Sequence, residues 1–215
     1  MTATERESNF RSHTNFLLLV ALFFGLVPSA WADSKENSAA ILGLAKTRCF
    51  ACHNPDDPTA IPGTPRLEGQ LAENLVLQLQ NYRSGERPHP VMAPIAKVLT
   101  DAQATNLCRY YSQQVPRAVR EMSDRDDRGK DLFLNGNLQT GVAACAWCHG
   151  LEGEGLAPHF PRIASQVPDY TLNQLNVFAK VDDFGNRFAW VMKAAILNLT
   201  DEEAMAVAEY LSTLP

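Results

Sequence analysis

The chain has 215 residues, of which 46% are hydrophobic and 20% are charged, and its formal net charge is −5. This composition is ordinary for a folded globular protein, and it excludes a disordered chain, a collagen and a protein with many membrane spans. The acidic balance and the lack of any run rich in lysine and arginine lead us to expect no nucleic acid partner.

The N-terminal segment, residues 1–32, is predicted to be a cleavable secretory signal peptide. Its uncharged apolar run, Phe16–Val27, follows Arg11 and precedes the small-residue pattern Ala30-Trp31-Ala32. A membrane-spanning helix needs about 20 apolar residues, and Pro28 interrupts this run before that length is reached. We therefore expect cleavage after the last residue of the small-residue pattern and export to the periplasm, where disulfides are permitted.

The rest of the chain is predicted to be all-α, because no convincing strand alternation is present. Two helices are expected to begin at capping boxes, one at Thr100 with Gln103 and one at Thr200 with Glu203. Apolar residues follow each box at helical spacing. Four further helices are expected, over Ser38–Lys46, Leu75–Tyr82, Arg128–Leu134 and Tyr170–Phe178.

Four of the five cysteines form two copies of the pattern Cys-x-x-Cys-His, which is the attachment motif of c-type haem. The first copy is Cys49, Cys52 and His53, and the second is Cys145, Cys148 and His149. In this motif each thiol adds to one vinyl group of a porphyrin, and the adjoining histidine is held beneath the ring, where its imidazole can bind iron. We therefore predict two covalently bound haem c groups, each with its motif histidine as one axial iron ligand.

Three other chemistries would use the same cysteines. A four-cysteine zinc site usually has about 15–20 residues between its cysteine pairs, whereas 92 residues separate Cys52 from Cys145, and zinc leaves both histidines unexplained. A thioredoxin-like redox motif needs neither the histidine nor a second copy. A disulfide within each motif is allowed in an exported protein, but a bridge across so short a spacing is strained. Covalent haem is the interpretation that uses every residue of both motifs.

The sequence contains an internal duplication that extends beyond the two motifs. A shift of 96 residues superposes the motifs and also three later pairs: Pro65-Arg66 with Pro161-Arg162, Gln70 with Gln166, and Gln78 with Gln174. After four extra residues in the second copy, a shift of 100 superposes Arg87 with Arg187, Met92 with Met192 and Tyr110 with Tyr210. We therefore predict two homologous units, residues 33–117 and 118–215, with a charged linker at about residues 115–128. A unit of about ninety residues buries little apolar surface alone, so a covalent haem would supply a large part of each core.

The duplication also indicates the second axial ligand of each iron. Met92 and Met192 are related by the repeat, lie 39 and 43 residues after their histidines, and are expected on loops just before the capped helices. A methionine ligand raises the reduction potential of haem, although methionine more commonly fills gaps in a core. His89 competes for the first iron, but its repeat equivalent is Ala189, so we interpret it as an exposed loop residue.

Two further pairs of repeat-related residues are candidates for supporting the haems. Pro65 and Pro161 each lie twelve residues after an iron histidine, where a backbone carbonyl could accept the second ring N–H; a simple turn marker is the alternative. Arg87 and Arg187 lie five residues before the methionines and could pair with haem propionates; a solvated loop charge is the alternative.

The fifth cysteine, Cys108, has no partner left if the other four are in thioethers. Its repeat equivalent is Ala208, on the apolar face of a predicted helix. We therefore interpret it as a small buried core residue and not as a reactive thiol.

Taken together, these motifs resemble the dihaem cytochrome c4 family. Each unit has Cys-x-x-Cys-His, then Pro-Arg with a glutamine four residues after the arginine, then Gln-Leu, Arg, Met and Leu-Thr-Asp followed by Tyr, and the segment Leu132–Gly155 is especially similar. The first site departs from the family in reading Cys-His-Asn-Pro-Asp-Asp instead of a glycine-rich stretch. The resemblance implies two class I cytochrome c domains related by a pseudo-twofold axis, with His53 and Met92 on one iron and His149 and Met192 on the other. It also implies electron transfer in the periplasm, often to terminal oxidases and often with membrane association.

The leading functional hypothesis is therefore an electron carrier without substrate chemistry of its own, because two protein ligands on each iron leave no position for a substrate. Redox proteins are the expected partners, and the net charge of −5 suits docking to a basic surface. One alternative is a haem enzyme, such as a dihaem peroxidase or a thiosulfate-oxidising cytochrome. The other is the fixed cytochrome subunit of a dehydrogenase or reductase complex.

Overall fold

The computed structural model describes residues 30–54, 56–57, 61–180 and 187–215, and the apolar run of the predicted signal peptide lies outside this part of the chain. The chain separates into two compact units, Met1–Ala40 and Ile41–Pro215. Both cysteine motifs lie in the second unit. Among the described residues, no helix has both the length and the apolar composition needed to cross a membrane.

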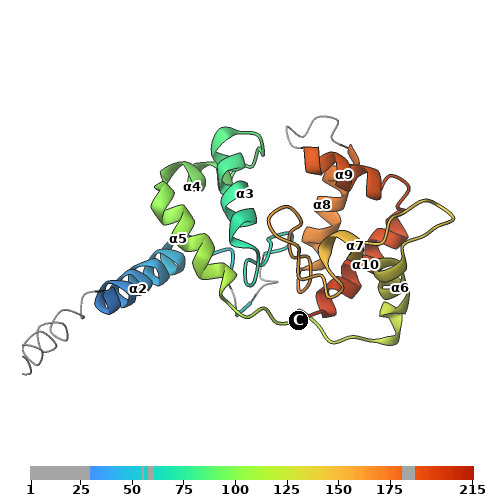
Figure 1. Ribbon diagram of the computed structural model, residues 1–215, viewed down its shortest axis with the longest axis horizontal. Helices are drawn as coiled ribbons and strands as arrows, with labels where there is room; N and C mark the ends of the chain where they lie inside the picture. Colours follow the sequence, from blue (N-terminus) through green and yellow to red (C-terminus); the bar gives the residue numbers. More distant parts are fainter. Residues whose placement is uncertain (1–29, 55, 58–60, 181–186) are drawn as a thin grey trace, which may run out of the picture. The chain divides into compact units, whose positions relative to one another are not determined.

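The described residues form helices and no strand, which confirms the all-α fold class (Figure 1). The helices are α2 (Ala30–Arg48), α3 (Ala72–Ser84), α4 (Met92–Val98), α5 (Asp101–Ser112), the short 3₁₀ helix η1 (Asp124–Asp126), α6 (Asp127–Asn135), α7 (Ala146–His149), α8 (Pro168–Lys180), α9 (Arg187–Ala195) and α10 (Asp201–Thr213).

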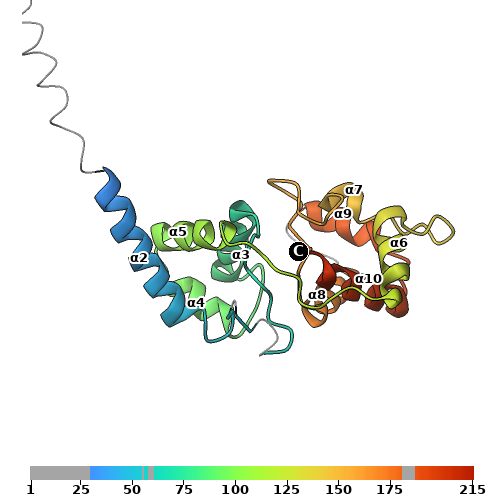
Figure 2. The same cartoon turned by 90° about the horizontal axis from the view of Figure 1, so that it is seen from below.

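The same succession of elements occurs twice in the chain. A helix precedes each cysteine motif (α2 and α6), a longer helix follows it (α3 and α8), and a short helix (α4 and α9) then leads to a capped helix (α5 and α10). In the first half α3 packs against α4 and α5, and in the second half α8 packs against α9 and α10 (Figure 2). In addition, α6 packs extensively against α10. This parallel order is what the sequence duplication predicts.

Both predicted capping boxes are confirmed. The Thr100 hydroxyl accepts a hydrogen bond from the Gln103 backbone N–H at 3.2 Å, and the Gln103 side chain accepts from the Thr100 N–H at 3.0 Å. Thr200 and Glu203 make the equivalent reciprocal pair at the start of α10. Each box pairs backbone N–H groups that would otherwise have no partner at a helix start, so the two capped helices begin where the sequence places them.

Each half has its own apolar core beside its cysteine motif. The first core contains Ala45, Leu99, Ala104, Leu107 and Tyr111, and Cys49 packs against it. The second core contains Leu132, Phe133, Val142, Ala146, Val207, Tyr210 and Leu211, and Cys145 packs against it. The helices before and after each motif therefore hold the thiols at the edge of an apolar interior.

The predicted position of the two methionines on loops is wrong. Met92 is the first residue of α4, and Met192 lies inside α9. Pro94 does not interrupt α4, because it is in the first turn, where a helix needs no N–H from it. The Nδ1 atom of His89 accepts a hydrogen bond from the Met92 N–H at 3.1 Å and so stands in for a conventional cap.

Candidate haem-binding sites

Each cysteine motif forms a single helical turn. The His53 N–H donates to the Cys49 carbonyl at 2.8 Å. In the second motif, which α7 contains, the His149 N–H donates to the Cys145 carbonyl at 2.9 Å. Residues three and four apart on such a turn lie on the same side. The two thiols and the imidazole of each motif are therefore presented together, as covalent attachment and iron ligation require.

The motif histidines are oriented by the two candidate prolines. The His53 Nδ1 atom lies 2.8 Å from the Pro65 carbonyl oxygen, and the His149 Nδ1 atom lies 2.8 Å from the Pro161 carbonyl oxygen. Since a carbonyl only accepts hydrogen bonds, Nδ1 carries the proton in both rings and Nε2 keeps its lone pair free for a metal. Burial is also the main reason that the pKa of each histidine is lowered, which favours the neutral imidazole that binds iron.

The thiols suit thioether formation better than the other cysteine chemistries. All five cysteines are free of disulfides. Burial raises the pKa of Cys49, and it raises the pKa of Cys145 to about 11, so neither thiol is poised as a thiolate for redox exchange. Within the described ranges, no three His, Cys, Asp or Glu side chains form a group that could hold a metal ion. The four-cysteine zinc site therefore has no geometric support.

The surroundings of the first motif also fit a bound prosthetic group. The Tyr111 hydroxyl is buried and has no hydrogen bond of normal geometry. It lies close enough to the Cys49 thiol to lower the pKa of that thiol, against the larger, opposite effect of burial. A buried polar atom without a hydrogen-bond partner is uncommon in a protein interior. The residues present therefore fit a haem held by the two cysteines of each motif and by its histidine.

The two candidate methionine ligands lie in corresponding short helices, although at different positions within them. Both side chains are half-buried. Met92 begins the helix that packs on α3, and Met192 lies in the helix that packs on α8. His89, the competing ligand, is exposed and uses Nδ1 to accept the N–H groups of Val91 and Met92. Its role in the structure is to cap the helix that carries Met92, and the ligand assignment itself remains a prediction.

The arginine predicted to pair with a propionate has protein partners in this structure. Arg87 is half-buried and donates to the side chains of Gln78 at 2.6 Å, Gln174 at 3.0 Å and Tyr170 at 3.2 Å. Its guanidinium also lies 4.8 Å from the centre of the Tyr82 ring. The repeat-related glutamines thus share one arginine. The side chain of Arg187 lies outside the described residues, so pairing of either arginine with a propionate remains a prediction.

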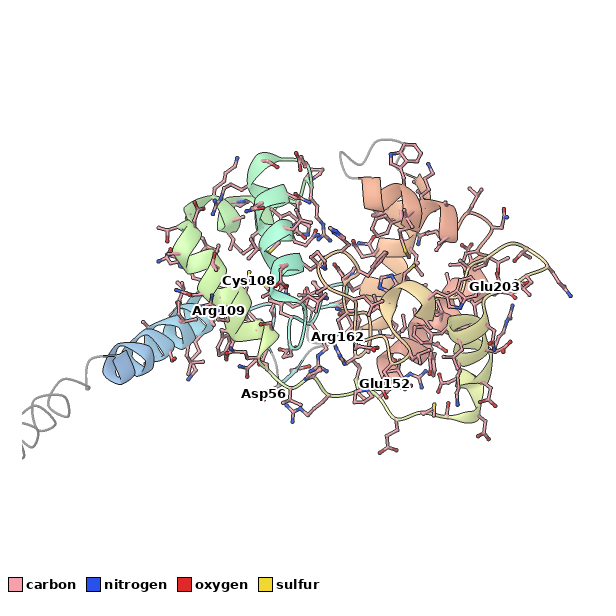
Figure 3. The ribbon with its side chains drawn as sticks, viewed as in Figure 1. Asp56, Cys108, Arg109, Glu152, Arg162 and Glu203 are labelled. Atoms are coloured by element: carbon pink, nitrogen blue, oxygen red, sulfur yellow. The ribbon has the colours of Figure 1, made fainter. Side chains whose placement is uncertain are left out.

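The fifth cysteine is buried, as the duplication predicted. Cys108 lies on α5 and is 2% exposed (Figure 3). Burial is the main cause that raises the pKa of this thiol to about 12, so it stays protonated at neutral pH. Cys108 is therefore a core residue and offers no nucleophile to a substrate.

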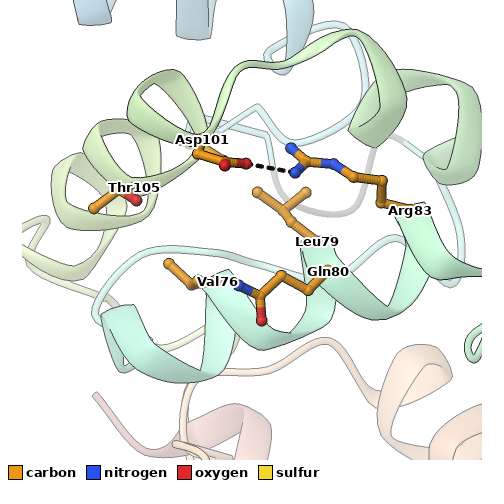
Figure 4. Close-up of a pocket in the computed structure, with 7 residues that line it drawn as sticks. Val76, Leu79, Gln80, Arg83, Asp101 and Thr105 are labelled. Atoms are coloured by element: carbon orange, nitrogen blue, oxygen red, sulfur yellow. Dashed lines mark hydrogen bonds and ion pairs between the residues drawn. The ribbon is translucent and has the colours of Figure 1, made fainter.

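A small pocket lies between α3 and α5, and no residue of either cysteine motif lines it (Figure 4). Its volume is about 40 Å³, enough for one or two water molecules and too little for an organic substrate. Arg83 lines it and donates to Asp101 at 2.6 Å and to the Leu99 carbonyl at 2.9 Å. These bonds tie α3 to the start of α5.

Besides the bonds of Arg87 to Gln174 and Tyr170, sequence reasoning missed a second set of contacts between the two halves. The side chain of Gln70 hydrogen-bonds to the backbone of Arg162, and the side chain of Gln166 hydrogen-bonds to the backbone of Arg66. The alignment of the halves pairs the two glutamines with each other and the two arginines with each other. The repeat therefore marked these positions, but nothing in the sequence said that each glutamine reaches the opposite half.

Comparison with known proteins agrees with this chemistry. The pattern of the Cytochrome c family matches residues 127–215, which contain the second motif. Together with the geometry of the two sites, this match identifies a c-type cytochrome that carries covalently bound haem c and transfers electrons.

Similarity over most of the chain is more specific. A cytochrome c4 of Thiocapsa roseopersicina is 35% identical over 172 residues, covering 77% of this chain and 86% of the relative. A thiosulfate dehydrogenase electron acceptor of Thiomonas intermedia is 32% identical, covering 92% of this chain and 88% of the relative. The solved structure of Acidithiobacillus ferrooxidans cytochrome c4 is 32% identical with a TM-score of 0.69, covering 78% of this chain and 99% of that one. The chain belongs to the cytochrome c4 family.

Proposed function

We propose that this chain is a periplasmic dihaem electron carrier in which each iron has one histidine and one methionine ligand. The observation that carries the proposal is the repeated pair of a buried motif histidine and a prolyl carbonyl, with 2.8 Å between the Nδ1 and O atoms in both halves. An orienting acceptor of this kind is what a metal-ligating histidine normally has. Since both halves have it, two equivalent sites are expected.

The residues of the chain do three things in this proposal. The four motif cysteines hold the haems covalently, so the cofactors are retained in an extracytoplasmic space. His53 and His149 keep their proton on Nδ1 and present Nε2 to iron. Met92 and Met192 complete the coordination, and a thioether ligand raises the reduction potential. When bound, each haem supplies one iron that takes up or gives up a single electron.

The expected partners are redox proteins, with a terminal oxidase as one acceptor. A second assignment, electron acceptor of a thiosulfate dehydrogenase, is favoured by the name of the Thiomonas intermedia relative. In both cases the chain transfers electrons and the partner performs the substrate chemistry. Stopped-flow reduction by a purified thiosulfate dehydrogenase, followed by oxidation with a membrane fraction containing terminal oxidases, separates the two assignments. Fast reduction by the dehydrogenase favours the second, and fast oxidation without it favours the first.

Intact mass and carbon monoxide binding test the core of the proposal. The protein matured in a periplasm should keep two haems per chain after acid denaturation and begin at Asp33. In the reduced state it should bind little carbon monoxide at neutral pH, because both axial positions of each iron are filled. Met92→Ala should add one carbon monoxide site and Met192→Ala should add another. Stoichiometric binding of one carbon monoxide by the unaltered protein would favour the haem-enzyme alternative instead.

A further inference from the structure

Two glutamines clamp the backbone at the histidine-bonded prolines, and each glutamine comes from the opposite half. The Gln166 side chain accepts from the Arg66 N–H at 2.8 Å and donates to the Arg66 carbonyl at 3.3 Å. Gln70 does the same to Arg162, accepting from its N–H at 2.9 Å and donating to its carbonyl at 2.8 Å. The contacts are reciprocal: the repeat-related glutamine of each half bonds the repeat-related arginine of the other half.

The clamped N–H and the histidine-bonded carbonyl belong to the same peptide group. The amide between Pro65 and Arg66 accepts from His53 Nδ1 through its oxygen and donates to Gln166 through its nitrogen. A continuous hydrogen-bonded chain therefore runs from the imidazole through one amide to a side chain of the other half.

The second half contains the mirror arrangement. The amide between Pro161 and Arg162 accepts from His149 Nδ1 and donates to Gln70. Each series of hydrogen bonds thus begins at the histidine of one half and ends at a glutamine of the other half.

Hydrogen bonds in such a chain strengthen one another. When an amide N–H donates, more electron density moves to the carbonyl oxygen, which then becomes a better acceptor. A better acceptor on Nδ1–H makes the imidazole a stronger electron donor to a metal, which favours ferric iron and lowers the reduction potential. Arg66 and Gln166 are 8% and 9% exposed, so the hydrogen bonds between His53 and Gln166 lie in a low-dielectric interior where this polarisation is effective. Gln70 is only half-buried.

We propose that Gln166 tunes the haem of the first half and Gln70 tunes the haem of the second half, each acting through the Pro–Arg amide of the opposite half. Both are positioning residues that act through the motif histidines. The inference rests on the proposed function, because it takes His53 and His149 as the iron ligands.

The test uses the full-length holoprotein and the near-isosteric variants Gln166→Met and Gln70→Met, which remove both hydrogen bonds of a clamp. The reduction potentials are measured by redox titration and assigned to each haem by NMR. Gln166→Met should raise the potential of the first haem more than that of the second. Gln70→Met should raise the potential of the second haem more than that of the first, and this rise should be smaller than the rise that Gln166→Met causes at the first haem. The Nδ1–H proton signal of the histidine in the opposite half should move and exchange faster with water.

Gln174→Met is the matched control. It breaks another hydrogen bond between the halves, the one from Arg87, but touches neither Pro–Arg amide. It should leave both Nδ1–H signals in place. If it moves them as much as the other variants do, the effect is a general loosening of the interface and the inference is overturned.

A variant of opposite sign guards against failure of the methionine variants to fold. Gln166→Glu keeps an oxygen for the Arg66 N–H and makes it a stronger acceptor, so the His53 Nδ1–H signal should move in the opposite direction while that of His149 stays in place. A change confined to the haem of the altered residue's own half, or no change at either histidine, overturns the inference. In those cases two low-spin haems in the wild type would still support the proposed function, whereas a wild type without them would refute that function as well.

Discussion

The most direct test of the packing concerns the glycine where α6 crosses α10. Gly129 is buried in α6, and a Cβ atom placed on it would overlap the Ala206 carbonyl oxygen of α10. The same atom would lie 2.7 Å from the Ala206 carbonyl carbon and 2.8 Å from Tyr210 Cβ. Two of these obstacles are backbone atoms, so no rotamer change relieves them. Gly129→Ala must push the two helices apart.

The expected cost follows from two opposing effects. Alanine improves helix propensity over glycine by about 1 kcal/mol. Overpacking a well-packed interior costs about 1–3 kcal/mol, and more where backbone must move. Separation of α6 from α10 also weakens the contact of Phe133 with Tyr210, whose ring centres are 5.6 Å apart. We therefore expect a net loss of about 2 kcal/mol in the free energy of unfolding of the second half.

Gly43 in α2 provides a matched control, because nothing lies within 4 Å of a Cβ placed there. Gly43→Ala should be neutral or should stabilise the protein by up to about 1 kcal/mol, since only the helix propensity changes. Guanidinium unfolding of the holoprotein measures both variants. Tryptophan fluorescence reports on the second half through Trp147 and Trp190, and circular dichroism reports on the whole chain. Equal midpoints for the two variants would refute the argument that α6 and α10 approach closely at this glycine.

Three further outcomes are expected. Cys108→Ala should keep both haem spectra and lower the free energy of unfolding by on the order of 1 kcal/mol, and rapid alkylation of the native thiol at pH 8 would contradict its raised pKa. In the folded protein the hydrogen bond from Arg120 lowers the pKa of Asp126. The hydrogen bond from the Thr200 N–H likewise lowers the pKa of Glu203. Their stabilisation should therefore be complete above the usual carboxyl range of about pH 4 to 4.5 and be lost as the pH falls below it. Asp126→Asn should flatten this acid dependence in a urea titration series, and an unchanged slope would count against it. Thr200→Ala should lower stability by about 1 kcal/mol through loss of the cap, measured as a lower urea midpoint with an unchanged m-value.

The features that the sequence determined are those that depend on residues close together in the chain. Each cysteine motif spans five residues, so its turn is local, and the chemistry of thiols beside a histidine can be predicted from spacing. The capping boxes at Thr100 and Thr200 satisfy N–H groups within the same turn. The helices α3, α5, α6, α8 and α10 were expected from patterns of the same short range, whereas α4 and α9 were expected to be loops. Internal comparison added Pro65 and Pro161, because a repeat shows which positions recur even where their partners are unknown.

The tertiary structure decided the features whose partners are distant in sequence. The helix that begins at Met92 depends on the His89 ring as a cap, and neither residue type signals a helix start. Gln70 and Gln166 are uncharged polar residues of a common type, and only the docking of one half on the other brings them to backbone groups more than 90 residues away. Uncharged side-chain amides leave no hydropathy or charge pattern that points to a particular acceptor. Local sequence therefore specifies which groups could bind haem, whereas the packing of the two halves specifies which groups hold each histidine's acceptor in place.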